Sequence, residues 1–332
     1  MFKRKDTDFL AVSARIHAME TRMLSRERME RMIDAKDAGD ALKILEECGY
    51  ADAGRGGLDG LEKMLAAERC SVFQDVHDAV PDPSLVEVFQ LKYDYHNAKV
   101  LVKADAVGAD PVPLLLPGGR YDCGELLEGW RREELTMCSD SYAKAMQEAA
   151  EVLSETGDPQ QADLILDAAC YGEMAQLARR SGSRFLQGYV ELSVDTANLR
   201  TLVRCARLEK DAEFVARVLL PGGSVDGQTL ALARPEQWKE LFSFPALCQA
   251  AQEGEPVAQP GGGPLTAFER MCDDALTDYL AQSRQIPFGE EVVIGYLYSK
   301  EAEITAVRII LSGRMAGLDA ETIRSRLRAV LV

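Results

Sequence analysis

Apolar residues recur along most of the chain at the three- and four-residue spacing of an amphipathic helix. This pattern predicts helices over residues 9–45, 61–80, 85–107, 141–180, 265–284 and 290–311. The first has one candidate break, at Gly39, and the fourth turns at 156–159. The sequence shows no convincing alternation with period two, which is typical of a half-buried strand. We therefore predict a mainly helical, all-α protein.

One helical segment occurs twice. Leu91–Lys103 reads LKYDYHNAKVLVK and Leu192–Arg204 reads LSVDTANLRTLVR, with a constant offset of 195 − 94 = 101 residues. The polar members in register are Asp94 and Asp195, Asn97 and Asn198, Lys99 and Arg200, and Lys103 and Arg204. Asp and Asn are mediocre helix formers, and like charges four residues apart disfavour a lone helix. Their repetition indicates the same tertiary contacts made twice.

A similar turn sequence follows each copy of the helical segment. Leu115–Asp122 reads LLPGGRYD, and Leu219–Asp226 reads LLPGGSVD. Pro-Gly-Gly predicts a turn, and Asp122 and Asp226 are expected to cap the helices that follow.

A third copy is more divergent. Tyr298–Arg308 stands 303 − 198 = 105 residues after the second copy, with Glu303 in place of the Asn and Lys300 in place of the Asp. Thr305 replaces the first cation, Arg308 lies near the second, and Asp319 is expected to cap a last helix. The repeats predict three helical domains over 1–120, 121–232 and 233–332, the last with a Gly/Pro-rich loop at 252–264.

Composition excludes several classes of protein. The 332 residues carry 38 cations and 54 acids, a net charge of −16, which argues against binding nucleic acid or anionic lipid. The eight cysteines lie singly, without zinc-site spacing, as expected for reduced thiols in the cytosol. A run of about 18 apolar residues, which a membrane span needs, is missing from the sequence. We expect a soluble, intracellular protein.

The sequence lacks the common catalytic motifs. It has neither a P-loop nor a GxSxG nucleophile elbow, and its three histidines, His17, His77 and His96, form no metal-binding pair. His96 beside Asp94 is the best catalytic candidate. Its counterpart in the second copy is Ala197, and residues two apart on a helix point in different directions. A surface or boundary histidine is therefore expected.

The repeated polar residues have two interpretations each. Asp94 with Asn97, and Asp195 with Asn198, are able to ligate a hard cation, but a helix-to-helix or helix-to-loop hydrogen-bond network is the simpler expectation. We hypothesise that they tie adjacent helices within each domain. The cationic rows are ordinarily solvated helix faces; against the acidic background, Arg200, Arg204 and Arg207 are also candidates for salt bridges between units or for a partner surface.

Several motifs together resemble one family. They are the YDYHNAK segment at 93–99, the DTANLRTLVR segment at 195–204, the two LLPGG turns and the KEAEI segment at 300–304. This combination is similar to the C-type subunits of V/A-type ATPases and ATP synthases, which are related to the d-type subunits of the eukaryotic V-ATPases. The resemblance spans essentially the whole chain.

The resemblance implies a non-catalytic rotor subunit without cofactors. It implies a funnel of three helical domains with pseudo-threefold symmetry, lying on the cytoplasmic face of the membrane. There it would join the central axle (subunits of the D and F type) to the proteolipid ring. The candidate structural or partner residues are Asp94, Asn97, Lys99, Lys103, Asp195, Asn198, Arg200, Arg204, Arg207, Glu303 and Arg308. The alternatives are a helical-repeat adaptor for another protein and a helical enzyme using Asp94 and His96.

Overall fold

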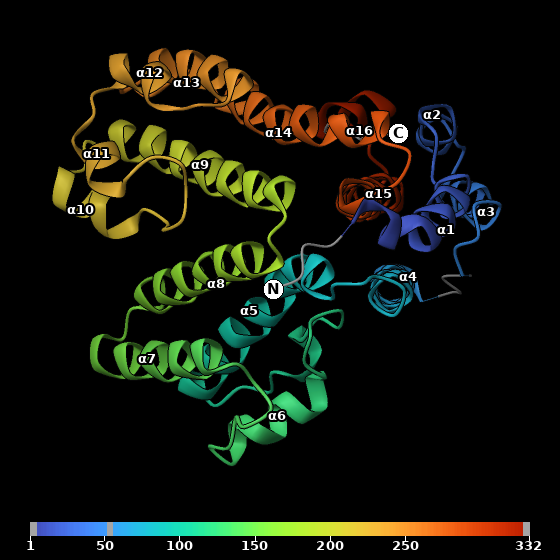
Figure 1. Cartoon of the computed structure of the whole chain (residues 1–332), viewed down its shortest axis with the longest axis horizontal. Helices are drawn as coiled ribbons and strands as arrows, with labels where there is room; N and C mark the ends of the chain where they lie inside the picture. The colour runs from blue at the N-terminus through green and yellow to red at the C-terminus, as the bar shows by residue number, and fades with distance from the viewer. Residues whose placement is uncertain (1–4, 52–55, 328–332) are drawn as a thin grey trace. The chain divides into compact units, whose positions relative to one another are not determined.

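The computed structural model describes residues 5–51 and 56–327, and throughout these residues the regular elements are helices. The α-helices are α1 (Leu10–Glu20), α2 (Arg26–Ile33), α3 (Ala38–Glu46), α4 (Gly57–His77), α5 (Ser84–Val107), α6 (Cys123–Arg131), α7 (Asp140–Thr156), α8 (Pro159–Ser181), α9 (Arg184–Arg207), α10 (Ala212–Val218), α11 (Gly227–Leu232), α12 (Trp238–Leu241), α13 (Pro245–Val257), α14 (Thr266–Ala281), α15 (Glu290–Met315) and α16 (Ala320–Arg326) (Figure 1). Short 3₁₀ turns lie at Asp6–Phe9, Val112–Leu114, Pro235–Gln237 and Gln282–Gln285. The prediction of an all-α fold is confirmed.

The prediction of a single helix over residues 9–45 is wrong, because three helices, α1, α2 and α3, occupy this stretch. The Ser25 side chain accepts a hydrogen bond from the backbone N–H of Arg28 at 3.3 Å and so begins α2. Asp37 does the same for Asp40 at 3.0 Å and begins α3, which places the expected break, Gly39, inside a helix. Both caps stand in a stretch rich in charged residues, where the helical spacing continues across them.

Other boundaries differ less. The helix expected from residue 61 begins earlier, at Gly57, as α4, and residues 52–55 before it lie outside the described residues. The loop expected over 252–264 is shorter, because α13 continues to Val257 with Pro256 in its last turn. The expected caps Asp122, Asp226 and Asp319 are confirmed: each side chain accepts backbone N–H groups of the helix that follows.

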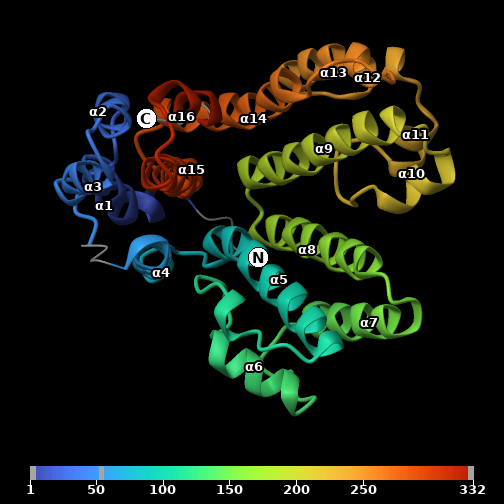
Figure 2. The same ribbon diagram turned by 180° about the vertical axis from the view of Figure 1, so that it is seen from behind.

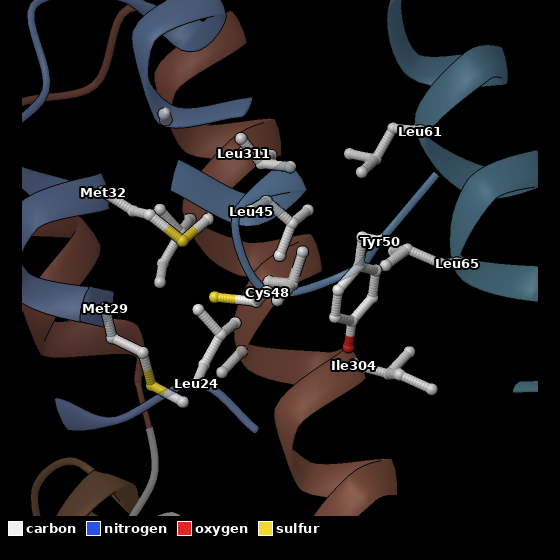
Figure 3. Close-up of a cluster of buried hydrophobic side chains, with 14 of the residues drawn as sticks. Leu24, Met29, Met32, Leu45, Cys48, Tyr50, Leu61, Leu65, Ile304 and Leu311 are labelled. Carbon is white, nitrogen blue, oxygen red and sulfur yellow. The ribbon is translucent and has the colours of Figure 1, made fainter. Parts of the chain in front are cut away.

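The chain divides into two compact units, residues 1–86 with 280–332, and residues 87–279. In the first unit, α15 is the central helix and packs against α1, α2, α3, α4 and α16. Its core combines side chains from both ends of the sequence, as Figure 3 shows for Leu24, Met32, Leu45, Leu61, Ile304 and Leu311. Apolar burial therefore joins the N-terminal and C-terminal parts of the chain.

In the second unit, α9 lies between α8 and α13, and α7 packs on α8. Figure 2 shows the same succession of helices from behind. A separate core surrounds α9 and includes Leu199, Leu202, Trp238, Phe242, Leu247 and Phe268. The three domain boundaries inferred from the repeats stay a prediction.

The three repeated helices, α5, α9 and α15, end in the same way. The residue after each helix, or close after it, is left-handed: Gly108 (φ 64°), Glu209 (φ 51°) and Gly317 (φ 71°). The next N–H then bonds back to the helix, from Ala109 to Ala104 O at 2.9 Å, from Lys210 to Cys205 O at 3.0 Å and from Leu318 to Gly313 O at 2.9 Å. This is the Schellman arrangement, which favours glycine. Only the second copy places a side chain there.

The substitution Glu209→Gly should therefore stabilise the protein. A left-handed L-residue costs about 1 kcal/mol, and this relief exceeds the extra unfolded-state freedom of glycine, leaving a net gain of about 0.5 kcal/mol. Urea unfolding measures the difference. The control is Glu148→Gly at an exposed position inside α7, which should lose about 1 kcal/mol. A loss of stability in Glu209→Gly would contradict the assignment.

Candidate functional site

In the first copy, the repeated polar residues of α5 bind the turn that follows the helix. Asn97 Nδ2 donates to the backbone oxygen of Leu116 at 2.9 Å, and the Leu116 N–H donates to Asn97 Oδ1 at 2.8 Å. Asp94 accepts the backbone N–H of Arg120 at 2.8 Å and its Nε at 2.6 Å. Asp94 and Asn97 are at most 1% exposed, so these bonds satisfy groups that water does not reach.

The second copy repeats the arrangement on α9. Asn198 Nδ2 donates to the oxygen of Leu220 at 3.0 Å, and the Leu220 N–H donates to Asn198 Oδ1 at 2.8 Å. Asp195 accepts the backbone N–H of Ser224 at 3.0 Å and its hydroxyl. The same contacts are made twice, and they tie each helix to its Pro-Gly-Gly turn. These contacts are the helix-to-loop form of the expected network. The hypothesis that the four residues tie adjacent helices is corrected, because their side chains bind the turn that follows each helix.

Each glycine of the turn has its own reason. The first, Gly118 or Gly222, has a positive φ of 108° or 97°, which L-residues rarely adopt. The second, Gly119 or Gly223, passes so close to Asp94 or Asp195 that a Cβ there would overlap the carboxylate oxygen. The carboxylate, the amide and the two glycines form one unit, which we call the helix-turn clasp.

The two clasps differ in the residue after the second glycine. Arg120 extends from Asp94 to Glu173 of α8, with Nη1 at 2.9 Å from its carboxylate, and Tyr95 donates its hydroxyl to the same Glu173 at 2.9 Å. Ser224 is too short for such a bridge. Burial raises the pKa of Asp94 to about 6, although the charge and hydrogen bonds of Arg120 act in the opposite direction.

The cationic rows of the repeated helices form ion pairs within the protein. On α5, Lys99 lies 2.6 Å from Asp167 and Lys103 lies 2.6 Å from Asp163, both on α8. On α9, Arg200 pairs with Asp273 and Arg204 lies 2.7 Å from Glu269, both on α14. In the other unit, Arg308 of α15 lies 2.7 Å from Glu62 of α4. We call these three sets of contacts, two rows and one single pair, the helix seams.

The seams follow one rule of spacing. In the first two, cations four residues apart on one helix face acids four residues apart on an antiparallel neighbour. Because these pairs are partly exposed, each contributes only about 0–1 kcal/mol, and their main effect is to fix which helices pair and in what register. Arg207 lies beyond the second seam and donates to the oxygen of Gly263 at 2.8 Å, in the Gly/Pro-rich loop.

The third copy uses the same positions with different chemistry. Glu303, with no exposed surface, accepts the backbone N–H of Leu24 at 2.6 Å, the Tyr50 hydroxyl at 2.5 Å and Lys300 Nζ at 2.7 Å. Lys300 also lies 2.7 Å from Glu68 of α4. Burial, followed by the Glu303 charge, raises the pKa of Tyr50, so its hydroxyl remains a donor. Figure 3 shows Tyr50 among the side chains of this core.

The structure separates the best catalytic candidate from its expected partner. The Nε2 atom of His96 lies 3.1 Å from the backbone oxygen of Leu114, while Asp94 is bound to Arg120. Within residues 5–51 and 56–327, no group of three or more His, Cys, Asp or Glu side chains is arranged to hold a metal ion. Among the same residues, no helix is long and apolar enough to span a membrane.

Sequence reasoning missed the partners of the candidate residues. The acids of α8 and α14 had a usable signal, because Asp163 with Asp167 and Glu269 with Asp273 have the same four-residue spacing as the cations they bind. No sequence signal indicated that Tyr50 and Leu24 are partners of Glu303. They lie 253 and 279 residues from Glu303 and share no motif with the first two copies.

Comparison with known proteins gives a consistent result. The family described as ATP synthase (C/AC39) subunit matches residues 12–326. The C subunit of the V-type sodium ATPase of Enterococcus hirae is 24% identical over 95% of this chain and 96% of its own length. The C subunit of the A-type ATP synthase of Halorubrum lacusprofundi is 26% identical with the same two coverages. The C subunit of the V-type ATP synthase of Thermus thermophilus is 26% identical over 93% of this chain and 94% of its own.

The clasps should contribute measurably to stability. Asn198→Ala leaves the N–H and C=O of Leu220 without their partner, which should lower the free energy of unfolding by about 1–3 kcal/mol. Asn97→Ala is the matched variant in the first copy and should lose a similar amount. Thermal and urea unfolding measure both. Unchanged melting in the two variants would refute a stabilising role for the clasp.

The raised pKa of Asp94 predicts a pH dependence. Because its carboxyl holds a proton more tightly in the folded than in the unfolded protein, the associated stability is full below about pH 4 and is lost as the pH rises through about 6. Asp94→Asn should remove the part of the fall in the free energy of unfolding that comes from this carboxyl, while the Asn oxygen still accepts a hydrogen bond from Arg120. Urea unfolding between pH 4 and 8 measures it, with Asp105→Asn, an exposed acid of the same helix, as the control. An equal decline in both variants would contradict the prediction.

Proposed function

Because this chain belongs to the ATP synthase (C/AC39) subunit family, and is therefore a non-catalytic subunit of a V/A-type rotary ATPase, we propose that it couples the central axle to the membrane rotor ring. In this role it receives the foot of the axle and passes torque between the axle and the proteolipid ring, during ATP-driven ion transport or ATP synthesis. The observation that carries the proposal is the family match from residue 12 to residue 326.

The partners we propose are the axle subunits of the D and F type and the ring proteolipid. The chain would be peripheral to the membrane, on its cytoplasmic face, held there by protein contacts. Its net charge of −16 favours partners with basic surfaces, because complementary charge accelerates and orients association. The predicted funnel of three domains belongs to this proposal.

The internal contacts suit a coupling element. A part that transmits torque must resist deformation, and the clasps and seams fix both the register of the long helices and the turns at their ends. The cationic residues that were candidates for a partner surface, Lys99, Lys103, Arg200, Arg204 and Arg308, bind acids of this chain. We therefore propose that they support the scaffold and that other residues contact the partners.

Co-purification tests the proposal. The chain is tagged in its own cells, the membranes are solubilised gently, and the recovered proteins are identified by mass spectrometry. We expect ring proteolipid and axle subunits together, and neither from an untagged strain. Recovery of neither, from cells in which those subunits are detected, would contradict the coupling role and favour the helical-repeat adaptor.

A further inference from the structure

Among the described residues after Glu303, the third repeat has no counterpart of the Pro-Gly-Gly turn. In the first two copies the leucine that the asparagine binds lies 116 − 97 = 19 and 220 − 198 = 22 residues after it. The same count from Glu303 reaches residues 322–325, which lie in α16. The sequence after Glu303 contains no proline, so the Pro-Gly-Gly turn has no counterpart there.

The corresponding bond comes from the other end of the chain. Glu303 accepts the backbone N–H of Leu24, as the side chains of Asn97 and Asn198 accept the N–H groups of Leu116 and Leu220. Leu24 is fully buried and is followed by Ser25, the cap of α2. The turn leucines of the first two copies likewise stand shortly before the caps of α6 and α11.

The seams give a second, independent observation. The seam partners in the first two copies, α8 and α14, each directly precede the next repeated helix, α9 and α15. The seam partner of α15 is α4, which directly precedes α5, the first repeated helix. The carboxylate of Glu303 and the seam of α15 therefore both bind residues that precede α5 in the sequence. In the first two copies, the corresponding partners follow the repeated helix.

We infer that residues 21–50, which we call the N-terminal latch, replace the missing turn and complete the third repeat. The three repeats are thus permuted along the sequence, because α15 is held by residues that precede the first repeated helix, α5. The latch concerns how this unit is assembled and does not depend on the rotor role.

The chemistry of Glu303 fits such a latch. The asparagine amide in the first two copies donates to the leucine oxygen and accepts from its N–H, whereas a carboxylate only accepts. The Glu303 carboxylate also accepts hydrogen bonds from the Tyr50 hydroxyl and from Lys300 Nζ. Lys300 Nζ lies 4.5 Å from the centre of the Tyr50 ring. The buried negative charge is thereby paired, and it binds both ends of the latch, at Leu24 and at Tyr50.

Hydrogen exchange of the full-length chain, read by mass spectrometry, tests this inference. In Glu303→Ala, exchange over residues 21–50 should accelerate at least tenfold, while residues 110–125 and 215–230 stay as in the wild type. The matched controls are Asn97→Ala and Asn198→Ala, which should accelerate the 110–125 and 215–230 regions respectively and leave 21–50 unchanged. Equal acceleration everywhere in Glu303→Ala, or none over 21–50, would overturn the latch.

A milder variant covers the case in which Glu303→Ala does not fold. Tyr50→Phe removes one hydroxyl and keeps the ring in the core, so the protein should fold. Selective acceleration over residues 21–50 in this variant supports the latch, and an exchange pattern equal to that of the wild type overturns it. Tyr142→Phe, which removes a buried hydroxyl bonded to the backbone of Asp94, is the control and should leave 21–50 unchanged.

Discussion

A buried polar side chain in the middle of a helix must find partners, and much of this structure follows from that requirement. Asp94 and Asn97, and again Asp195 and Asn198, lie where water does not reach, and their side chains bind groups outside their own helix. Each pair binds the backbone of a turn that lies between 19 and 29 residues further on. The requirement explains why that turn contains two glycines, since one adopts a positive φ and the other passes directly against the carboxylate.

The seams add selectivity to this plan. Long helices with apolar faces are able to pack in many registers, and apolar contact alone distinguishes them poorly. Rows of cations facing rows of acids at a spacing of four residues penalise the wrong registers, although each exposed pair adds little stability. The clasps determine where each repeated helix and its turn meet, and the seams determine which helix lies beside it.

These contacts also bear on function. In an enzyme, the unusual polar residues would converge on a cavity; here, those that the sequence singled out are satisfied by backbone groups and opposite charges of the same chain. That use agrees with a non-catalytic subunit of a rotary ATPase. The third repeat departs furthest from the pattern: it replaces an amide with a buried carboxylate, and this charge requires Lys300 and Tyr50 as partners.

The sequence by itself determined the helical class, the repeated segments, the caps at Asp122, Asp226 and Asp319 and the family, because these depend on local spacing and on residues close in the chain. It failed over residues 9–45, where Ser25 and Asp37 divide a continuous helical pattern, since a cap is an alternative bond that periodicity does not register. Only the tertiary structure decided what the repeated polar residues bind. Their partners lie from about 20 to 279 residues away, and the contact between Glu303 and Leu24 exists only when both ends of the chain pack into one core.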